Sequence, residues 1–344
     1  MKNQLRFALI LVAIAATAIA QTNQRQRGPL GEKIREARQK RAENKGETKT
    51  EANAKPNNNG SYVVGKNRFT TNVNGDTRVY YVHVPKSYNK ATAVPVVVML
   101  HGTGQTGEQF YNISGWKDVG ETENLITVFP SSWKQCVIDD GKQGNTLKWS
   151  SYPDGFTFCA GVTPRDDVKF LNQVLDEVSA KFNVNAKMIY FVGFSNGSQM
   201  AARVGIEMSE RIAGFVGHLG VAPPVPPKRL VPNIWQEGTE DPHYMGMFGG
   251  QSVPMDFNQI LAKPYMKGAM NLYMQTFKLS PKYTTGGNPN NIIWLDAKGT
   301  SGDPNNVFRL AFVKGMEHEY PNGKNHPVHG AELNWQWLKQ FKLP

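Results

Sequence analysis

The sequence predicts an α/β fold built on a mostly parallel central sheet with helices on both faces. Strand-like apolar runs alternate with helix-like runs from residue 94 to the C-terminus, as expected for a chain of β-α units. The first of these runs, Val94–Leu100, is apolar throughout, which is typical of a parallel strand covered on both faces. Residues 61–344 have a globular composition and a length that fits one large domain.

The first twenty residues have the pattern of a secretory signal peptide. Lys2 and Arg6 give a positive start, Phe7–Ala16 is apolar, and Ala18-Ile19-Ala20 is an A-x-A cleavage motif. The apolar run is short for a helix that spans a bilayer, although an uncleaved anchor stays open as the alternative. We therefore expect a secreted protein, extracellular or periplasmic, that is not held at a membrane after cleavage.

Residues 21–60 are expected to form a basic linker without a folded core. The segment holds no aromatic residue, and residues 21–57 carry ten Lys or Arg against five Glu. Such a composition buries too little apolar surface to offset the entropy of ordering the chain. Much of the formal net charge of +11 belongs to this segment. Because no basic patch with interleaved aromatics follows it, we expect no nucleic-acid partner.

The apolar runs set the expected order of elements from residue 61 onward. An antiparallel pair over 61–85 turns at Asn74-Gly75-Asp76. The elements expected after it are strands over 94–100, 125–130, 188–192, 212–219, 231–235, 292–295 and 307–313, and helices over 116–124, 166–182, 198–208 and 331–341. Residues 136–163 are expected to form a long loop, and the acids Asp166 and Asp167 to cap the helix that follows. The Met-rich stretch 243–291 is expected to be a lid or an insertion, with ordinary core filling as the alternative.

A pentapeptide with the pattern G-x-S-x-G lies between a predicted strand and a predicted helix. It reads Gly193-Phe194-Ser195-Asn196-Gly197. A nucleophile elbow needs this order, because its serine sits on a tight strand-to-helix turn where neighbouring side chains would collide. We therefore expect Ser195 to be a nucleophile. An ordinary Gly-rich turn is the alternative.

A serine nucleophile needs a base and an acid that orients the base. In folds with this elbow the chain order is serine, then the acid, then histidine. Asp241 and His318 follow Ser195 in that order, and each comes directly after a predicted strand. The alternatives that the sequence leaves open are Glu237 and Glu240 for the acid, and His326 and His329 for the base.

An oxyanion hole needs two backbone N–H groups near the serine hydroxyl. One is expected from Asn196, the residue after the nucleophile, and the other from Thr103 in the loop that follows the strand 94–100. Gly102 and Gly104 flank Thr103 and allow a close approach of the backbone. His101 is expected to be structural, and a plain turn is the alternative for this loop.

The chain has two cysteines, Cys136 and Cys159. An even count in an exported protein favours a disulfide bond, with two free thiols as the alternative. Their spacing, without a second Cys or a His pair, is unlike a metal site. We expect no structural metal and no cofactor.

Aromatic residues are frequent in and near the segment between the two cysteines. Trp133, Trp149 and Tyr152, together with Phe194 of the elbow, are candidates to line an acyl pocket. Core packing is the alternative for each of them.

Several motifs together resemble a group of exported α/β-hydrolases that includes polyhydroxybutyrate depolymerases and the related feruloyl and acetylxylan esterases. The motifs are Leu100-His101-Gly102, Trp116 with the strand into Phe129-Pro130, Arg165-Asp166-Asp167-Val168, the elbow, Gly238-Thr239-Glu240-Asp241, and His318 followed by Tyr320-Pro321. The resemblance implies an α/β-hydrolase fold and a serine esterase whose triad falls on Ser195, Asp241 and His318. It spans residues 77–341.

The chain departs from that group at two places, which leaves the substrate open. Glu237 stands where the group usually has a histidine, and Lys314-Gly315-Met316-Glu317 precedes His318 in place of a run of glycines. The expected function is hydrolysis of carboxylic esters, of feruloyl or acetyl groups on plant polysaccharide or of polyhydroxyalkanoate, so the partner is an ester substrate, polymeric or small. A peptidase or amidase on the same scaffold and a non-catalytic binding module are the alternatives.

Overall fold

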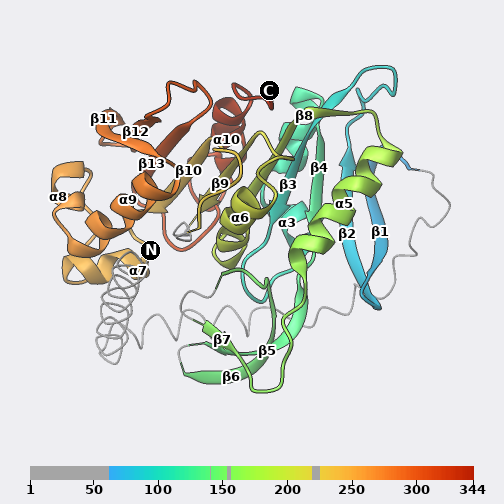
Figure 1. The fold of residues 1–344 in the computed structure, drawn as a ribbon, viewed down its shortest axis with the longest axis horizontal. Coiled ribbons are helices and arrows are strands. Elements are labelled where there is room, and N and C mark those ends of the chain that lie inside the picture. The colour runs from blue at the N-terminus through green and yellow to red at the C-terminus, as the bar shows by residue number, and fades with distance from the viewer. Residues whose placement is uncertain (1–61, 140, 153–155, 219–224) are drawn as a thin grey trace, which may run out of the picture.

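A ten-stranded sheet forms the centre of the molecule (Figure 1), with the strand order β1-β2-β4-β3-β8-β9-β10-β13-β12-β11. The computed structural model describes residues 62–139, 141–152, 156–218 and 225–344. The expected signal peptide and linker lie outside the described residues. The strands are β1 (Gly65–Val73), β2 (Asp76–Val84), β3 (Val94–Leu100), β4 (Ile126–Pro130), β8 (Val184–Phe194), β9 (Gly214–His218), β10 (Asn233–Gly238), β11 (Leu279–Asn288), β12 (Ile292–Gly299) and β13 (Val307–Val313).

The middle of the sheet is parallel and its two edges are antiparallel. Strands β4, β3, β8, β9, β10 and β13 pair in parallel, whereas β1 and β2 at one edge and β12 and β11 at the other pair antiparallel. Together with the helices on both faces, this arrangement confirms the predicted α/β-hydrolase fold class.

Helices cover both faces of the sheet because successive side chains of each strand point to opposite sides. In β3, Val96 and Val98 enter one hydrophobic core and Val97 and Met99 enter the other. The first core includes side chains of α5 (Asp167–Lys181), α6 (Asn196–Glu207), α8 (Phe257–Leu261) and α9 (Pro264–Thr276), and the second includes side chains of α3 (Gly107–Ile113), α4 (Trp116–Glu123) and α10 (Gly330–Leu338).

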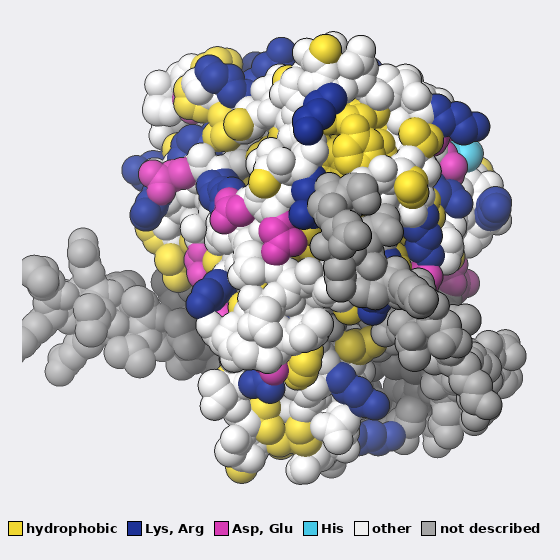
Figure 2. Space-filling view, turned by 90° about the vertical axis from the view of Figure 1, so that its right-hand side faces the viewer, with side chains coloured by type: hydrophobic (Ala, Val, Ile, Leu, Met, Phe, Trp, Pro, Cys, Tyr) yellow, Lys and Arg dark blue, Asp and Glu magenta, His cyan; other side chains and the backbone are white. Residues whose placement is uncertain are grey.

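A small second sheet forms where the sequence predicted a long loop, so that prediction was wrong. It contains β5 (Trp133–Asp139), β6 (Lys142–Lys148) and β7 (Phe156–Phe158) in the order β6-β5-β7. The strands are short and β6 is largely exposed, so no alternation of apolar and polar residues marked them. We call this sheet the β5–β7 lobe. It stands out below the main body, with apolar and basic side chains on its surface (Figures 1 and 2).

A disulfide bond between Cys136 and Cys159 holds the lobe together, which confirms the predicted pairing. The two Cα atoms are 5.5 Å apart, within the usual range for a disulfide. Cys136 lies in β5 and Cys159 follows β7 directly. The bond therefore ties β5 to the end of β7, the first and last strands of the lobe.

The Met-rich stretch divides into short helices and one edge strand. α7 (Pro242–Met245) and a 3₁₀ helix (Gly246–Phe248) precede α8 and α9, and residues 279–288 form the edge strand β11. Met266 and Met270 are buried in the core, and Tyr273 stacks on Trp235 with ring centroids 5.3 Å apart. Much of α9 therefore fills the core beside β10. No helix in the described residues is long and apolar enough to cross a membrane.

Candidate active site

Ser195 occupies the sharp turn between β8 and α6 in a strained backbone conformation. Its φ is 53° and its ψ is −123°, a combination that few non-glycine residues adopt. A Cβ at Gly193 would overlap the carbonyl of Gly197, and a Cβ at Gly197 would overlap the carbonyl of Leu100. The two glycines of the pentapeptide are therefore needed for the strand, turn and helix to pack this closely.

Three side chains from distant parts of the chain meet at this turn. His318 Nε2 lies 3.1 Å from Ser195 Oγ, and His318 Nδ1 lies 2.8 Å from Asp241 Oδ2. The three residues follow β8, β10 and β13 at their carboxyl ends, where parallel sheets collect their sites. Asp241 is 1% exposed, whereas the side chain of His318 is 25% exposed and accessible to a substrate.

The environment of Asp241 keeps its carboxyl group ionised. Burial alone raises the pKa of this carboxyl, but its hydrogen bond to His318 and the nearby imidazoles of His318 and His243 together lower the pKa below its usual value. Its Oδ1 atom also accepts the backbone N–H of His243 at 2.9 Å. An ionised Asp241 favours the proton on His318 Nδ1, so that Nε2 can accept from the serine hydroxyl.

The other candidate acids bind other side chains. Glu237 is fully buried, and its Oε1 atom accepts from the hydroxyl of Tyr244 at 2.7 Å and from the indole of Trp235. Glu240 accepts a hydrogen bond from the hydroxyl of Ser252. Asp241 is the candidate that the structure brings to the histidine.

The other candidate bases lie outside hydrogen-bond contact with the serine. His326 Nε2 is 2.8 Å from the carbonyl oxygen of Lys314, and His329 is exposed, with its Nδ1 atom 3.9 Å from Glu332. His318 is therefore the histidine that the fold brings to Ser195.

The two backbone N–H groups expected to bind an oxyanion are those of Thr103 and Asn196. Within the described residues, the N–H groups of Thr103 and Asn196 have no hydrogen-bond acceptor, since Asn196 is the first residue of α6. The loop that carries Thr103 is fixed, because the next N–H, of Gly104, donates to the carbonyl of Leu147 at 2.7 Å. Such preorganised donors can stabilise an oxyanion.

The segment Leu147–Ser151, which we call the brace, joins the two sides of this candidate oxyanion hole. The side-chain oxygen of Asn196 accepts the N–H of Trp149 at 2.6 Å, and its amide nitrogen donates to Ser151 Oγ at 3.1 Å. The indole N–H of Trp149 donates to the carbonyl of His101 at 2.9 Å. The brace therefore ties the residue after the nucleophile to the loop after β3.

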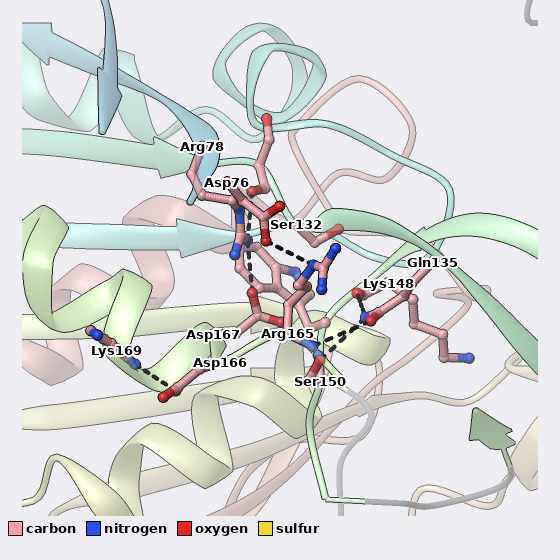
Figure 3. A network of polar contacts seen from close by, with 12 residues as sticks. Asp76, Arg78, Ser132, Gln135, Lys148, Ser150, Arg165, Asp166, Asp167 and Lys169 are labelled. Carbon is pink, nitrogen blue, oxygen red and sulfur yellow. Dashed lines mark hydrogen bonds and ion pairs between the residues drawn. The ribbon is translucent and has the colours of Figure 1, made fainter. Parts of the chain in front are cut away.

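A buried ion pair between Arg78 and Asp167 anchors the brace (Figure 3). Arg78 Nη2 lies 2.7 Å from Asp167 Oδ1, and both side chains are almost fully buried. The second oxygen of Asp167 accepts the N–H of Ser150 at 2.7 Å. Of the two expected caps, only Asp166 accepts from a helix N–H, that of Lys169 at 2.9 Å. The capping prediction for Asp167 was therefore wrong, because this carboxylate binds a buried guanidinium instead.

Of the four aromatic candidates for an acyl pocket, Phe194 is the one whose ring packs beside His318. Its ring centroid is 5.3 Å from that of His318. The hydroxyl of Tyr152 instead donates to Glu207 at 2.9 Å on the far part of α6, and the ring of Trp133 lies under the guanidinium of Arg165. Trp149, the fourth candidate, is fully buried, and its indole N–H binds the loop after β3.

His243 lies beside His318, a position that no motif of the sequence predicted. The ring centroids of His243 and His318 are 4.9 Å apart. His243 follows Asp241 by two residues on the short helix that Asp241 caps. That spacing was the available signal, since the side chain of an N-cap residue accepts the backbone N–H of the residue two or three positions later and so lies close to it.

The fold and this arrangement of serine, histidine and aspartate define the class of α/β-hydrolases. A family model described as phospholipase/carboxylesterase matches residues 83–278. The chain belongs to this family.

Among characterised relatives, feruloyl esterase B of Piromyces equi is 26% identical over 282 residues, which cover 78% of this chain and 46% of that protein. Poly(3-hydroxyalkanoate) depolymerase C of Paucimonas lemoignei is 26% identical over 135 residues, or 39% of this chain and 29% of that protein. These relatives confirm the resemblance inferred from the motifs. The chain covers less than half the length of the first curated relatives that it matches.

Among solved structures, the acetyl xylan esterase from Aspergillus awamori superposes with a TM-score of 0.47 and 13% sequence identity. The superposition covers 79% of this chain and 98% of that chain.

Proposed function

We propose that the chain is a serine carboxylic-ester hydrolase that works through an acyl-enzyme. The observation that carries this proposal is the continuous line of hydrogen bonds from Ser195 Oγ to His318 and on to Asp241, with lengths of 3.1 and 2.8 Å. A hydroxyl, an imidazole and a buried carboxylate in this order form the machinery of acyl transfer.

In the proposed reaction Ser195 Oγ attacks the ester carbonyl while His318 Nε2 accepts the hydroxyl proton. Asp241 orients the imidazole and stabilises its charged form. The N–H groups of Thr103 and Asn196 bind the oxyanion of the tetrahedral intermediate. His318 then protonates the leaving alkoxide, and a water molecule, activated by the same imidazole, hydrolyses the acyl-enzyme to release the acid.

The substrate class is inferred from the motifs and from the names of relatives. We propose feruloyl or acetyl esters of plant polysaccharide, or polyhydroxyalkanoate esters, as substrates. We also propose that the protein is secreted, on the basis of its signal-like first twenty residues and its disulfide bond, since disulfides persist in oxidising compartments. A release assay with feruloylated arabinoxylan, acetylated xylan, short-chain polyhydroxybutyrate and a peptide panel separates these substrates. Turnover of peptides alone would replace the ester assignment with a peptidase.

The decisive variant is Ser195→Ala, assayed on short p-nitrophenyl esters. We expect kcat to fall by at least about 10³-fold, because the nucleophile is removed while binding and the oxyanion donors remain. A fluorophosphonate probe should label the wild type and not the variant. Ser209→Ala is the matched control, since this serine is buried and its hydroxyl accepts the N–H of Arg229 at 3.3 Å. Undiminished turnover in Ser195→Ala would overturn the proposal.

A further inference from the structure

Three side chains with metal-binding atoms converge at the edge of the catalytic site. Asp241, His243 and His318 each offer one ligand atom, and these atoms all lie within 4.8 Å of one another. In the described part of the chain this is the one group of three or more histidine, cysteine or acidic residues that comes so close together. The proposed hydrolysis uses Asp241 and His318 but assigns no chemistry to the His243 imidazole.

We propose that these three residues form an inhibitory site for Zn²⁺. Two imidazoles and one carboxylate are a donor set that zinc prefers, with water as the fourth ligand. Ligand atoms about 2.0–2.1 Å from a tetrahedral zinc are roughly 3.3 Å apart, so the most widely spaced pair must close by at most roughly 1.5 Å. His243 is exposed on the four-residue helix α7, and exposed side chains change rotamer readily.

Zinc at this position blocks the catalytic base whichever ring nitrogen it binds. His318 Nε2 faces the hydroxyl of Ser195, and His318 Nδ1 faces Asp241. Coordination at Nε2 removes the acceptor for the serine proton, and coordination at Nδ1 breaks the contact that orients the ring. The loss of activity rests on the proposed function, whereas the binding of zinc does not.

The other described histidines provide a matched comparison. His83, His101 and His218 are buried, and His326 is bonded to a backbone carbonyl. His329 is exposed like His243 but belongs to no such group of three in the described residues, and its Nδ1 atom lies 3.9 Å from Glu332. One imidazole and one carboxylate bind zinc weakly, so His329→Gln is the control for His243→Gln.

The first experiment measures hydrolysis of a p-nitrophenyl ester by untagged protein at buffered free Zn²⁺ concentrations, with the enzyme-free rate subtracted. We expect reversible inhibition of the wild type that a chelator relieves. His243→Gln should need at least about tenfold more zinc, since even the loss of residues that only support the ligands costs a metal site 10–100-fold in affinity. The zinc concentration for half-inhibition is taken relative to the zinc-free rate of each variant, and His329→Gln should respond as the wild type does.

The second experiment measures binding without catalysis. Zinc is titrated calorimetrically into Ser195→Ala, and Co²⁺ is added in parallel to follow the visible absorption of a tetrahedral site. One equivalent should bind, and the added His243→Gln substitution should weaken this binding at least about tenfold. If the wild type hydrolyses no ester but zinc still binds through His243, the site stands and the proposed function falls. Equal inhibition or equal binding with and without His243, or none in the wild type, overturns the site.

Discussion

The backbone conformation of Ser195 is strained, and hydrogen bonds to neighbouring residues hold it in place. A non-glycine residue in such a region is strained by about 1–3 kcal/mol. The N–H of Ser195 donates to the carbonyl of His218 at 2.8 Å, and the carbonyl of Ser195 accepts from the N–H of Ser198 at 2.8 Å. These bonds fix the turn on both sides, so the hydroxyl is presented to His318 without rearrangement.

At the residue scale too, the contribution of the Trp149 indole N–H to catalysis can be tested by itself. Trp149→Phe keeps an aromatic ring in place but removes the donor to the carbonyl of His101. We expect kcat to fall about tenfold, because the loss of one buried hydrogen bond costs about 1 kcal/mol or slightly more and here misplaces the oxyanion loop. KM should change little, since ground-state binding of the ester does not need that donor.

The control for this prediction is Trp116→Phe, in which another buried indole loses its hydrogen bond to Tyr320, 2.9 Å long, away from the brace. Steady-state kinetics on a p-nitrophenyl ester give the comparison. A similar fall of kcat in both variants would mean that Trp149 has no specific positioning role.

At the scale of elements, the Arg78–Asp167 pair connects β2, the start of α5 and the brace. Replacing Asp167 by Asn leaves the guanidinium of Arg78 buried without its counter-charge. Removal of one partner from a buried pair costs about 3–5 kcal/mol, and we expect a loss of that order in the free energy of unfolding. Asp166→Ala, which removes only a helix cap, should cost about 1 kcal/mol. Urea denaturation monitored by tryptophan fluorescence measures both, and equal losses would contradict the special role of Asp167.

At the scale of the whole molecule, His218 makes the stability depend on pH. Its side chain is completely buried at the end of β9, and burial lowers its pKa from 6.5 to about 3. Below pH 6.5 the unfolded chain therefore takes up a proton that the folded chain refuses, so stability falls as the pH falls, until the folded form is protonated near pH 3. Above pH 6.5 the residue is neutral in both states and has no such effect.

Between pH 3 and pH 6.5, we expect the titration of His218 to contribute at most about 1.4 kcal/mol per pH unit to the slope of the unfolding free energy against pH. The measurement is the free energy of unfolding between pH 7 and pH 4 for the wild type and for His218→Asn. Carboxylates titrate in both proteins and cancel in the difference. Parallel curves for the two proteins would show that His218 does not titrate as its burial implies.

Periodicity and motif order predicted most of the central sheet and placed the three residues that meet at the elbow. Ser195, Asp241 and His318 could be chosen because each follows a strand that is recognisable from its apolar run. The brace could not be found this way, because its bonds join side chains to backbone groups or a hydroxyl far away in the sequence, and periodicity gives no signal for such pairs. The β5–β7 lobe was missed because β7 has only three residues and β6 is polar and exposed, and β11 because most of its residues are exposed.

The bond between Cys136 and Cys159 has a practical consequence for anyone who prepares this protein. It closes the lobe whose strand β6 ends in the brace. An expression host that keeps thiols reduced will deliver polypeptide with that lobe unlinked, and we expect the catalytic rates of such batches to lie below those of the oxidised molecule. Export to the periplasm, or controlled air oxidation during refolding, is therefore the preparation to choose before any two variants are ranked.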